Sequence, residues 1–281
     1  MHGFRVSVFQ EFAIPLPIAE LLFLFVAGFS GGVINSIAGG GSFITFPALL
    51  FVGVPPIMAN ATNTYASCAG YMSGAFAFRR ELLAHRSALP KVMLISLSGG
   101  ILGAWLLLQT SETLFTEAIP WLLLLATTLF VFGARLNSLS RSWAGTHRHA
   151  SIAGAATMAF LLLAICTYGG FFNAGLGIIA LSYLTLAGHT DINAMNGLKL
   201  LISSTVSIVA IALFIHDGVI AWYAGTVLLL GTLAGGYFSA RLSRRLPQHL
   251  VRRFVIIASC VITVFFFYDT YISLNQIIIC S

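Results

Sequence analysis

Charged side chains are scarce in this sequence. Only 8% of its 281 residues are Asp, Glu, Lys or Arg, whereas soluble globular proteins carry about 25%. Apolar runs near 20 residues recur along the whole length, and each is long enough to cross a bilayer core about 30 Å thick. The longest polar stretch, 135–150, is too short to fold alone. The composition therefore excludes a soluble domain and predicts a polytopic protein embedded in a lipid bilayer.

Motifs of catalysis and metal binding are absent as well. The four cysteines, Cys68, Cys166, Cys260 and Cys280, form no CxxC pair and lie in or beside apolar segments, which favours small buried hydrophobes. No HExxH, GxSxG, Walker or paired-carboxylate pattern occurs. We therefore expect no enzyme, no cofactor and no metal site. Without an ATP site, any transport would be driven by gradients.

Positive charge is confined to a few places. Of 14 Lys and Arg residues, 12 fall in three stretches, 79–91, 135–148 and 241–253. This clustering is typical of cytoplasmic loops under the positive-inside rule, so the net charge of +6 predicts no nucleic-acid partner. The exceptions are Arg5 in the N-terminal tail and Lys199 inside an apolar segment.

Hydropathy predicts eight long spans and two short apolar pieces. The long spans fall near 17–38, 60–78, 89–109, 116–135, 151–173, 192–215, 219–240 and 254–279. The short pieces fall near 43–54 and 176–188. A helix of twelve residues is only about 18 Å long, so neither short piece spans a membrane unaided.

The two halves of the chain share a pattern. "GGVINSIAGGG" begins at Gly31 and "GGFFNAGLG" at Gly169, which matches Asn35 with Asn173. A short apolar piece follows each, and then a polar start to a long span, "IMANATNT" or "INAMNGLK". Chance similarity between glycine-rich spans is the alternative. The common order and spacing predict a duplication, with repeats at 1–140 and 141–281 forming one membrane domain.

Charge sets the relative orientation of the halves. The basic stretch 79–91 corresponds to "HDG" at 216–218, and the acidic "TSETLFTE" corresponds to the basic 241–253. Every matched pair of loops has opposite character, so we predict an all-α fold of two inverted-topology repeats. Each half then makes an odd number of crossings, and both termini face the outside.

The glycine-rich segments predict breaks within the membrane. The short piece after each break either completes a crossing or forms a re-entrant hairpin, and both place irregular backbone where protein or a polar cavity must enclose it. Gly39, Gly40 and Gly41 permit positive φ, and we expect Ser42 to cap the following helix. Two such helix starts aimed at one place would suit an anionic substrate. Close helix packing is the alternative explanation of the glycines.

Lys199 is the sharpest single signal. A lysine within a span is costly and normally faces a cavity, a partner or the interface. It lies about two turns into its segment, so snorkelling to the interface is the alternative. We expect it to face a cavity and hold an anion, and Asp191 is its expected protein partner.

Side-chain amides and hydroxyls open the two matching spans. They can replace water around an oxyanion, although interhelical hydrogen bonding is an equally good explanation. Together with the breaks they give the predicted substrate site: Asn35, Gly39, Gly40, Gly41, Ser42, Asn60, Thr62, Asn63, Asn173, Gly175, Gly177, Asn196 and Lys199.

Two stretches resemble a known family. "NSIAGGGSFITFPALLFVGVPPIMANATNTYASCAGYMSGAFAFRRE" and "YGGFFNAGLGIIALSYLTLAGHTDINAMNGLKLLISS" look like the TauE/SafE sulfite-exporter-like permeases, over essentially the full chain. The resemblance implies a multi-pass carrier of the bacterial inner membrane for sulfite, sulfonates such as sulfoacetate, and related anions. Some members carry Lys where this chain has Thr64, an acid near Asn35 and Gly near Asn173. These departures leave Lys199 as the main fixed positive charge.

Three function classes follow. The first is a secondary transporter of a small sulfur oxyanion working by alternating access, with H⁺ or Na⁺ as the possible coupling ion. The second is an anion channel of similar architecture. The third is an intramembrane enzyme or assembly factor, which the missing catalytic motifs disfavour. The sequence leaves the direction of transport and any homo-oligomer open.

Overall fold

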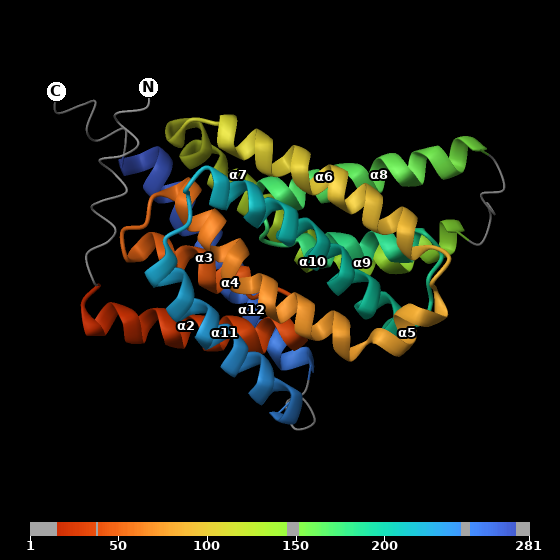
Figure 1. The fold of residues 1–281 in the computed structure, drawn as a ribbon, viewed down its shortest axis with the longest axis horizontal. Helices are drawn as coiled ribbons and strands as arrows, with labels where there is room; N and C mark the ends of the chain where they lie inside the picture. Colours follow the sequence, from red (N-terminus) through yellow and green to blue (C-terminus); the bar gives the residue numbers. More distant parts are fainter. Residues whose placement is uncertain (1–15, 38, 145–151, 243–247, 274–281) are drawn as a thin grey trace.

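The computed structural model describes residues 16–37, 39–144, 152–242 and 248–273, and within them every regular element is helical. Each predicted long span is a helix: α2 (Ile18–Ile37), α4 (Pro56–Ala77), α6 (Leu89–Gln109), α7 (Glu112–Ala144), α8 (Ile152–Phe171), α10 (Ile192–His216), α11 (Trp222–Leu242) and α12 (Gln248–Tyr268). The two short pieces are α3 (Ser42–Phe51) and α9 (Leu176–Leu186). Figure 1 shows them inside the bundle. The expected all-α class is confirmed.

Hydropathy and length together mark four described segments as candidate spans. They lie in α2, α6, α8 and α10. α4 is also long enough to cross a bilayer, but Asn, Thr and Ser make it more polar, and 13 of its 22 residues are buried. Its polar side chains therefore face protein, not lipid. The exposed surface carries large apolar side chains such as Phe76 at the end of α4, Trp105 and Phe160, as a lipid-facing surface requires.

Some predicted boundaries are wrong. Residues 135–144 were expected in a polar loop, yet α7 continues to Ala144 because this stretch has neither Pro nor Gly to end a helix. The predicted repeat boundary at 140 lies within α7, and the division into two repeats stays a prediction. The basic stretch 79–91 contains a short helix, α5 (Arg79–Ala84), and α12 gives way to a π-helical turn, Asp269–Ser273. Arg5, Cys280 and both chain ends lie outside the described residues.

The first short helix folds back on the long helix that precedes it. A β-carbon placed on Gly41 would lie 2.3 Å from the carbonyl oxygen of Gly31 and 2.9 Å from Cβ of Asn35. One turn further into α3, the Cγ2 methyl of Thr45 would lie 2.5 Å from a β-carbon placed on Gly31. These contacts run antiparallel, so α2 and α3 form a re-entrant hairpin. A full extra crossing, the other arrangement that the sequence allowed, does not occur there.

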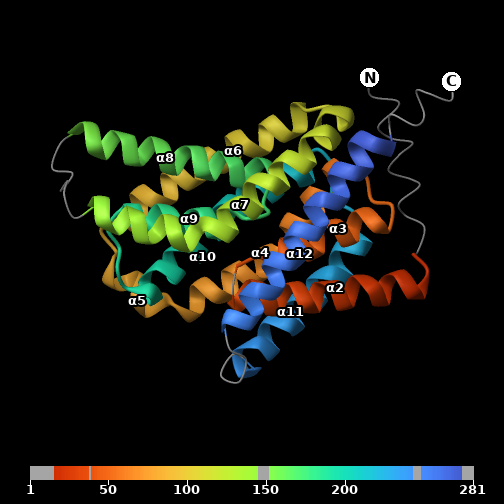
Figure 2. The same ribbon diagram turned by 180° about the vertical axis from the view of Figure 1, so that it is seen from behind.

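The second break has a similar form. Leu176, the first residue of α9, packs its side chain against Gly169 near the end of α8. The hydroxyl of Tyr168 donates to the carbonyl oxygen of Ala174 at 2.9 Å, which ties the connecting loop to α8. In Figures 1 and 2, α9 turns back beside α8 toward the end of the molecule that carries α5.

Glycine contacts join the two halves of the chain. α2 packs along α11, where a β-carbon on Gly235 would lie 2.0 Å from the carbonyl oxygen of Phe29. α6 packs along α8, where one on Gly103 would lie 2.0 Å from the carbonyl oxygen of Thr167. Each pair combines the first long helix of one half with the third of the other. This reciprocal pairing agrees with the predicted inverted repeat, whose membrane orientation stays a prediction.

The two ends of the molecule have different connections. At one end, Glu112 at the start of α7 accepts the Ile57 amide (3.3 Å), and Thr62 accepts the Ala221 amide (2.9 Å) just before α11. At the other end, the rings of His85 and His189 lie 5.6 Å apart, so the α4–α6 and α9–α10 connections meet. Figures 1 and 2 place the start of α2 and the end of α12 away from α5.

Candidate functional site

The first break is a tight glycine turn. Gly39 has φ +80°, and its amide donates to the carbonyl oxygens of Ile34 and Asn35 at the end of α2. Of the three consecutive glycines, only Gly39 adopts the left-handed region of backbone conformation. Gly41 has an ordinary helical φ of −58°, and a larger residue there would collide with α2. The expected Ser42 cap is wrong. The helix begins at Ser42 itself, with Gly41 at the cap position and no side-chain cap.

The second break uses a left-handed glycine too. Gly175 precedes α9 with φ +84°, a conformation that side chains other than glycine rarely adopt. A β-carbon there would also meet Cβ of Ala126 on α7 at 2.8 Å. The chain therefore reverses between α8 and α9 against α7, and Gly175 provides both the reversal and the close approach.

Lys199 lies where the two breaks meet. Its side chain is buried, with 7% of the residue exposed. A β-carbon on Gly39 would lie 3.7 Å from the Lys199 ammonium, and one on Gly177 would lie 3.4 Å from Lys199 Cδ and 3.7 Å from the Gly39 carbonyl oxygen. Residues of both interrupted segments are thus adjacent around one lysine, as the sequence predicts.

No carboxylate pairs with this lysine within the described part of the chain. Asp191, the expected partner, instead accepts the Asn193 amide at 3.0 Å and caps the start of α10. Asp191 is the N-cap residue of α10 and lies more than two helical turns before Lys199. The expectation of an Asp191–Lys199 pair is wrong, and the buried ammonium has no counter-charge among the described residues.

Lys199 lines a cavity of about 680 Å³. The wall is built from α2, α4, α10 and α11 together with the first break. It consists of Gly31, Gly32, Asn35, Gly41, Thr45, Ser67, Gly70, Ser73, Gly74, Ala77, Phe78, Asn196, Lys199, Leu200, Thr232, Leu233, Gly236 and Tyr237. Cavities of this size are typical of small-molecule sites.

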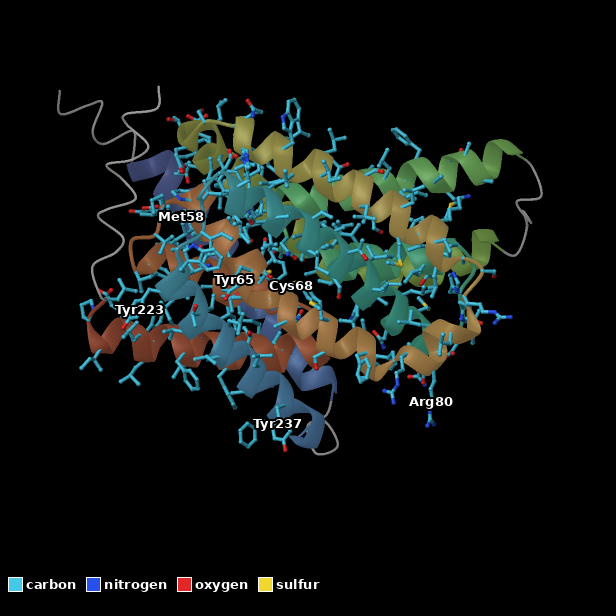
Figure 3. All side chains as sticks on the ribbon, viewed as in Figure 1. Met58, Tyr65, Cys68, Arg80, Tyr223 and Tyr237 are labelled. Atoms are coloured by element: carbon cyan, nitrogen blue, oxygen red, sulfur yellow. The ribbon has the colours of Figure 1, made fainter. Side chains whose placement is uncertain are left out.

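The cavity runs along α4 toward one end of the molecule. From Ser67 to Phe78 the helix advances about 16 Å. Figure 3 shows α4 passing from Met58 through Tyr65 and Cys68 toward Arg80, and α11 passing from Tyr223 to Tyr237. Tyr237 is 59% exposed and lines the cavity. The mouth therefore lies on the side of the molecule that carries Phe78 and Tyr237, near α5.

A buried aromatic cluster lies outside the cavity lining, where α3, α7 and the second break meet. The rings of Phe46 and Phe172 meet edge to face at 5.3 Å, Phe115 lies 5.8 Å from Phe171 and 6.4 Å from Phe172, and Tyr168 lies 6.3 Å from Phe172. Phe46, Phe115 and Phe172 are fully buried. Since Phe115 belongs to the first turn of α7, this packing fills the interior toward the end of the molecule where α7 begins.

The structure divides the predicted site residues into two groups. Asn35, Gly41, Asn196 and Lys199 line the cavity. Gly39 and Gly177 contact Lys199, and Gly40 and Ser42 are buried in the first break. Their role in binding stays a prediction.

The remaining polar residues hold helices together. Asn60 donates to the Phe171 carbonyl oxygen at 2.9 Å, and Thr62 receives the Ala221 amide. Asn173 accepts from the Tyr71 hydroxyl (3.1 Å) and donates to Ser207 (3.3 Å). These bonds favour the structural explanation for Asn60, Thr62 and Asn173, which the sequence had left open beside a binding role.

Asn63 connects the break to α4. Its Oδ1 accepts from the Thr45 hydroxyl at 2.5 Å, while its buried Nδ2 has no partner within the described residues. A buried amide donor without a partner is costly. Because Thr45 itself lines the cavity, this bond fixes one part of the cavity wall.

Many residues of the cavity wall were not predicted from the sequence. Ser67, Gly70, Ser73, Gly74 and Ala77 recur at spacings of three and four, and therefore form one stripe of small residues along α4. This pattern is visible in the sequence and would have marked a face that leaves room beside it. Gly236 on α11 also lines the cavity.

Comparisons with known proteins support a membrane transporter. The family described as sulfite exporter TauE/SafE matches residues 24–266. A probable membrane transporter protein of Haemophilus influenzae is 30% identical over 250 residues, covering 89% of this chain and 95% of its own. The probable membrane transporter proteins YfcA of Escherichia coli K12 (30% over 252 residues; 88% and 90%) and ORF9 of a Sinorhizobium species (30% over 247; 87% and 91%) are similar. No solved structure matches significantly. The chain therefore belongs to the TauE/SafE family of membrane transporters.

Proposed function

We propose that the protein is a secondary carrier that moves small sulfur-containing oxyanions, such as sulfite and sulfonates including sulfoacetate, across the bacterial inner membrane. The observation that carries the proposal is Lys199, a buried lysine in a large cavity with no carboxylate partner among the described residues. Burying an ammonium in a membrane protein is costly unless another charge compensates it. A bound anion would supply that charge.

The surroundings of Lys199 favour an anion in further ways. The described residues of the cavity lining include no Asp or Glu, so none of them repels a negative charge. Asn35, Ser67 and Asn196 provide amides and a hydroxyl that can donate to oxyanion oxygens. The short helices α3 and α9 begin within this region, and helix starts favour anions.

The shape of the cavity supports alternating access. Its lining reaches toward the end with α5, whose basic residues predict a cytoplasmic location, and the buried aromatic cluster of Phe46, Phe115 and Phe172 packs outside the lining, near the start of α7. A carrier needs a state closed on one side while open on the other. The present arrangement corresponds to an inward-facing state, and the outward-facing state would part the aromatic cluster.

The test is flux in proteoliposomes with labelled sulfite or a labelled sulfonate. Replacing Lys199 by Met keeps the length of the side chain and removes its charge. The loss of one charged hydrogen bond should weaken binding by about ten- to a hundredfold, with a matching loss of flux at low substrate concentration. Lys91, the other lysine of the chain, is exposed, and Lys91→Met is the matched control.

Several outcomes distinguish the function classes. Saturable flux with counterflow, lost in Lys199→Met and retained in Lys91→Met, supports the carrier. Flux without saturation or counterflow favours a channel instead. If the folded Lys199→Met variant transports like the parent protein, Lys199 takes no part in binding and the proposal is wrong.

A further inference from the structure

We infer that the cavity selects sulfonates that carry a single negative charge and an uncharged apolar tail. This inference rests on the proposed function and narrows it to a substrate class. The sulfonate group would sit at Lys199, and the tail would point along α4 toward Phe78 and Tyr237.

The size of the cavity exceeds what a bare oxyanion needs. Its volume of about 680 Å³ equals that of about 20 water molecules in the liquid. Sulfite has only four heavy atoms and would fill a small part of it. A ligand that excludes water from this space must therefore extend well beyond the group that contacts Lys199.

The wall changes character between its deep end and its mouth. One part of the wall is polar, with the side chains of Asn35, Thr45, Ser67 and Thr232. Toward the mouth the lining consists mainly of Gly70, Gly74, Ala77, Leu200, Leu233, Phe78 and Tyr237, with Ser73 and Asn196 as the polar exceptions. Leu200 lies directly against Gly74. An apolar tail placed along this wall would lose contact with water and strengthen binding.

The charges of the lining set the charge of the ligand. Among the described residues that line the cavity, Lys199 is the single charged side chain. A second negative charge on the tail would find no cation, and an ammonium on the tail would find no carboxylate. Because moving an unpaired charge from water into such surroundings is costly, we expect sulfoacetate, a dianion that the proposed function includes, and zwitterions such as taurine to bind more weakly than sulfonates with an uncharged tail.

Gly70 offers a way to change the tail region alone. It lines the cavity, and a β-carbon placed there would meet no atom within 4 Å. Its backbone does not use the left-handed region. A leucine at this position can therefore project into the open space beside the tail without displacing another helix.

The experiment measures binding of an alkanesulfonate series to the purified full chain by ligand-induced thermal stabilisation. The series runs from methanesulfonate through propanesulfonate to hexanesulfonate, with taurine and sulfoacetate as charged-tail comparisons and 1-hexanol as a control for uptake by detergent. We expect Kd to fall about fourfold for each added methylene group. Taurine and sulfoacetate should bind more weakly than propanesulfonate.

Two variants at Gly70 test whether the tail of the ligand lies beside this residue. Gly70→Leu should shrink the ratio between the Kd values of methanesulfonate and hexanesulfonate, and Gly70→Ala should shrink it less. Ser98→Leu, which adds bulk at an exposed position on α6, should leave the ratio unchanged. If Gly70→Leu does not fold, the series in the parent protein and in Gly70→Ala decides.

The results separate the two proposals. The inference is overturned if the Kd does not change along the series, or if taurine binds as tightly as propanesulfonate. The proposed function stays intact in either case, provided that sulfite binding depends on Lys199. Absence of binding by every anion contradicts the proposed function and the inference together. A chain-length effect that Gly70→Leu does not reduce places the tail elsewhere and overturns the inference.

Discussion

Gly177 on α9 lies against the stem of Lys199 on α10: a β-carbon added to the glycine would lie 3.4 Å from Lys199 Cδ. This is an ordinary contact distance, so the second break supports the aliphatic part of the lysine and leaves its ammonium directed to the first break at Gly39. The two halves of the chain therefore jointly set the position of one cationic group.

This relationship gives a prediction for Gly177. Alanine should be tolerated, whereas leucine should occupy the space of the Lys199 stem and displace the ammonium. We expect Gly177→Leu to weaken anion binding by about tenfold or more, because a charged hydrogen bond contributes about 1.5–3 kcal/mol. Binding by thermal stabilisation measures the effect. Equal affinity in folded Gly177→Ala and Gly177→Leu proteins would contradict it.

The Thr45–Asn63 bond gives a second prediction. Thr45→Val removes the hydroxyl that donates to Asn63 Oδ1. Because Asn63 Nδ2 already lacks a partner among the described residues, the buried Asn63 amide would then lose its hydrogen bond to α3. We expect a loss of about 1–3 kcal/mol in unfolding free energy. The double variant Thr45→Val with Asn63→Leu should recover part of this loss, because it leaves no amide to satisfy. A double variant less stable than the sum of both single changes would refute this explanation.

The central geometry was predictable because glycine and lysine are conspicuous within apolar sequence. Three consecutive glycines and a matching motif half a chain away indicated both breaks, and the cost of burying Lys199 indicated a cavity. The repeated order of motifs then predicted that the breaks meet. The contacts among Gly39, Gly177 and Lys199 agree with each of these steps.

Other features depend on three-dimensional contacts that a local pattern does not contain. Ser42 resembles a helix cap, but the approach of Gly41 to Gly31 starts the helix one residue earlier than a Ser42 cap would. Asp191 resembles a partner for Lys199, but it caps its own helix. The aromatic cluster of Phe46, Phe115 and Phe172 joins three distant parts of the chain, and these residues look like ordinary apolar positions in the sequence.

The effect of replacing a glycine by alanine on the stability of the protein should depend on the space around that glycine. A β-carbon on Gly103 would lie 2.0 Å from the carbonyl oxygen of Thr167, so Gly103→Ala must push α6 away from α8. We expect a loss of about 1–3 kcal/mol, as for overpacked cores. Gly70→Ala, with open space around it, is the matched control and should melt close to the parent protein. Similar melting temperatures for the two variants would contradict the helix contact.

Stability should decline in mildly acidic solution through the His85–His189 contact. Burial, and secondarily the neighbouring His85, lower the pKa of His189 below its ordinary value of 6.5. Below pH 6.5 the unfolded chain therefore binds this proton more readily than the folded protein, so stability is fully present above that pH and falls as the pH drops further. Thermal unfolding between about pH 8 and pH 5 measures the decline.

A variant assigns this pH dependence. His189→Gln should reduce the acid-induced loss of stability, because it removes the titrating ring. His216→Gln, at the far end of α10, leaves the His85–His189 pair intact and is the matched control. An unchanged pH profile in His189→Gln would show that the loss arises from other groups.

The predicted orientation of the halves can be tested with cysteines at the two ends of the molecule. Arg80 lies on α5 at the basic end, and Asp217 follows α10 at the opposite end, beside the α11 start. Under the positive-inside rule the basic end faces the cytoplasm. In a background with the four native cysteines replaced by alanine, a membrane-impermeant maleimide added to intact spheroplasts should therefore label Asp217→Cys but not Arg80→Cys. Permeabilisation should expose the second site. Because the cavity opens near α5, the reverse labelling pattern would also reverse the assignment of the present state as inward-facing.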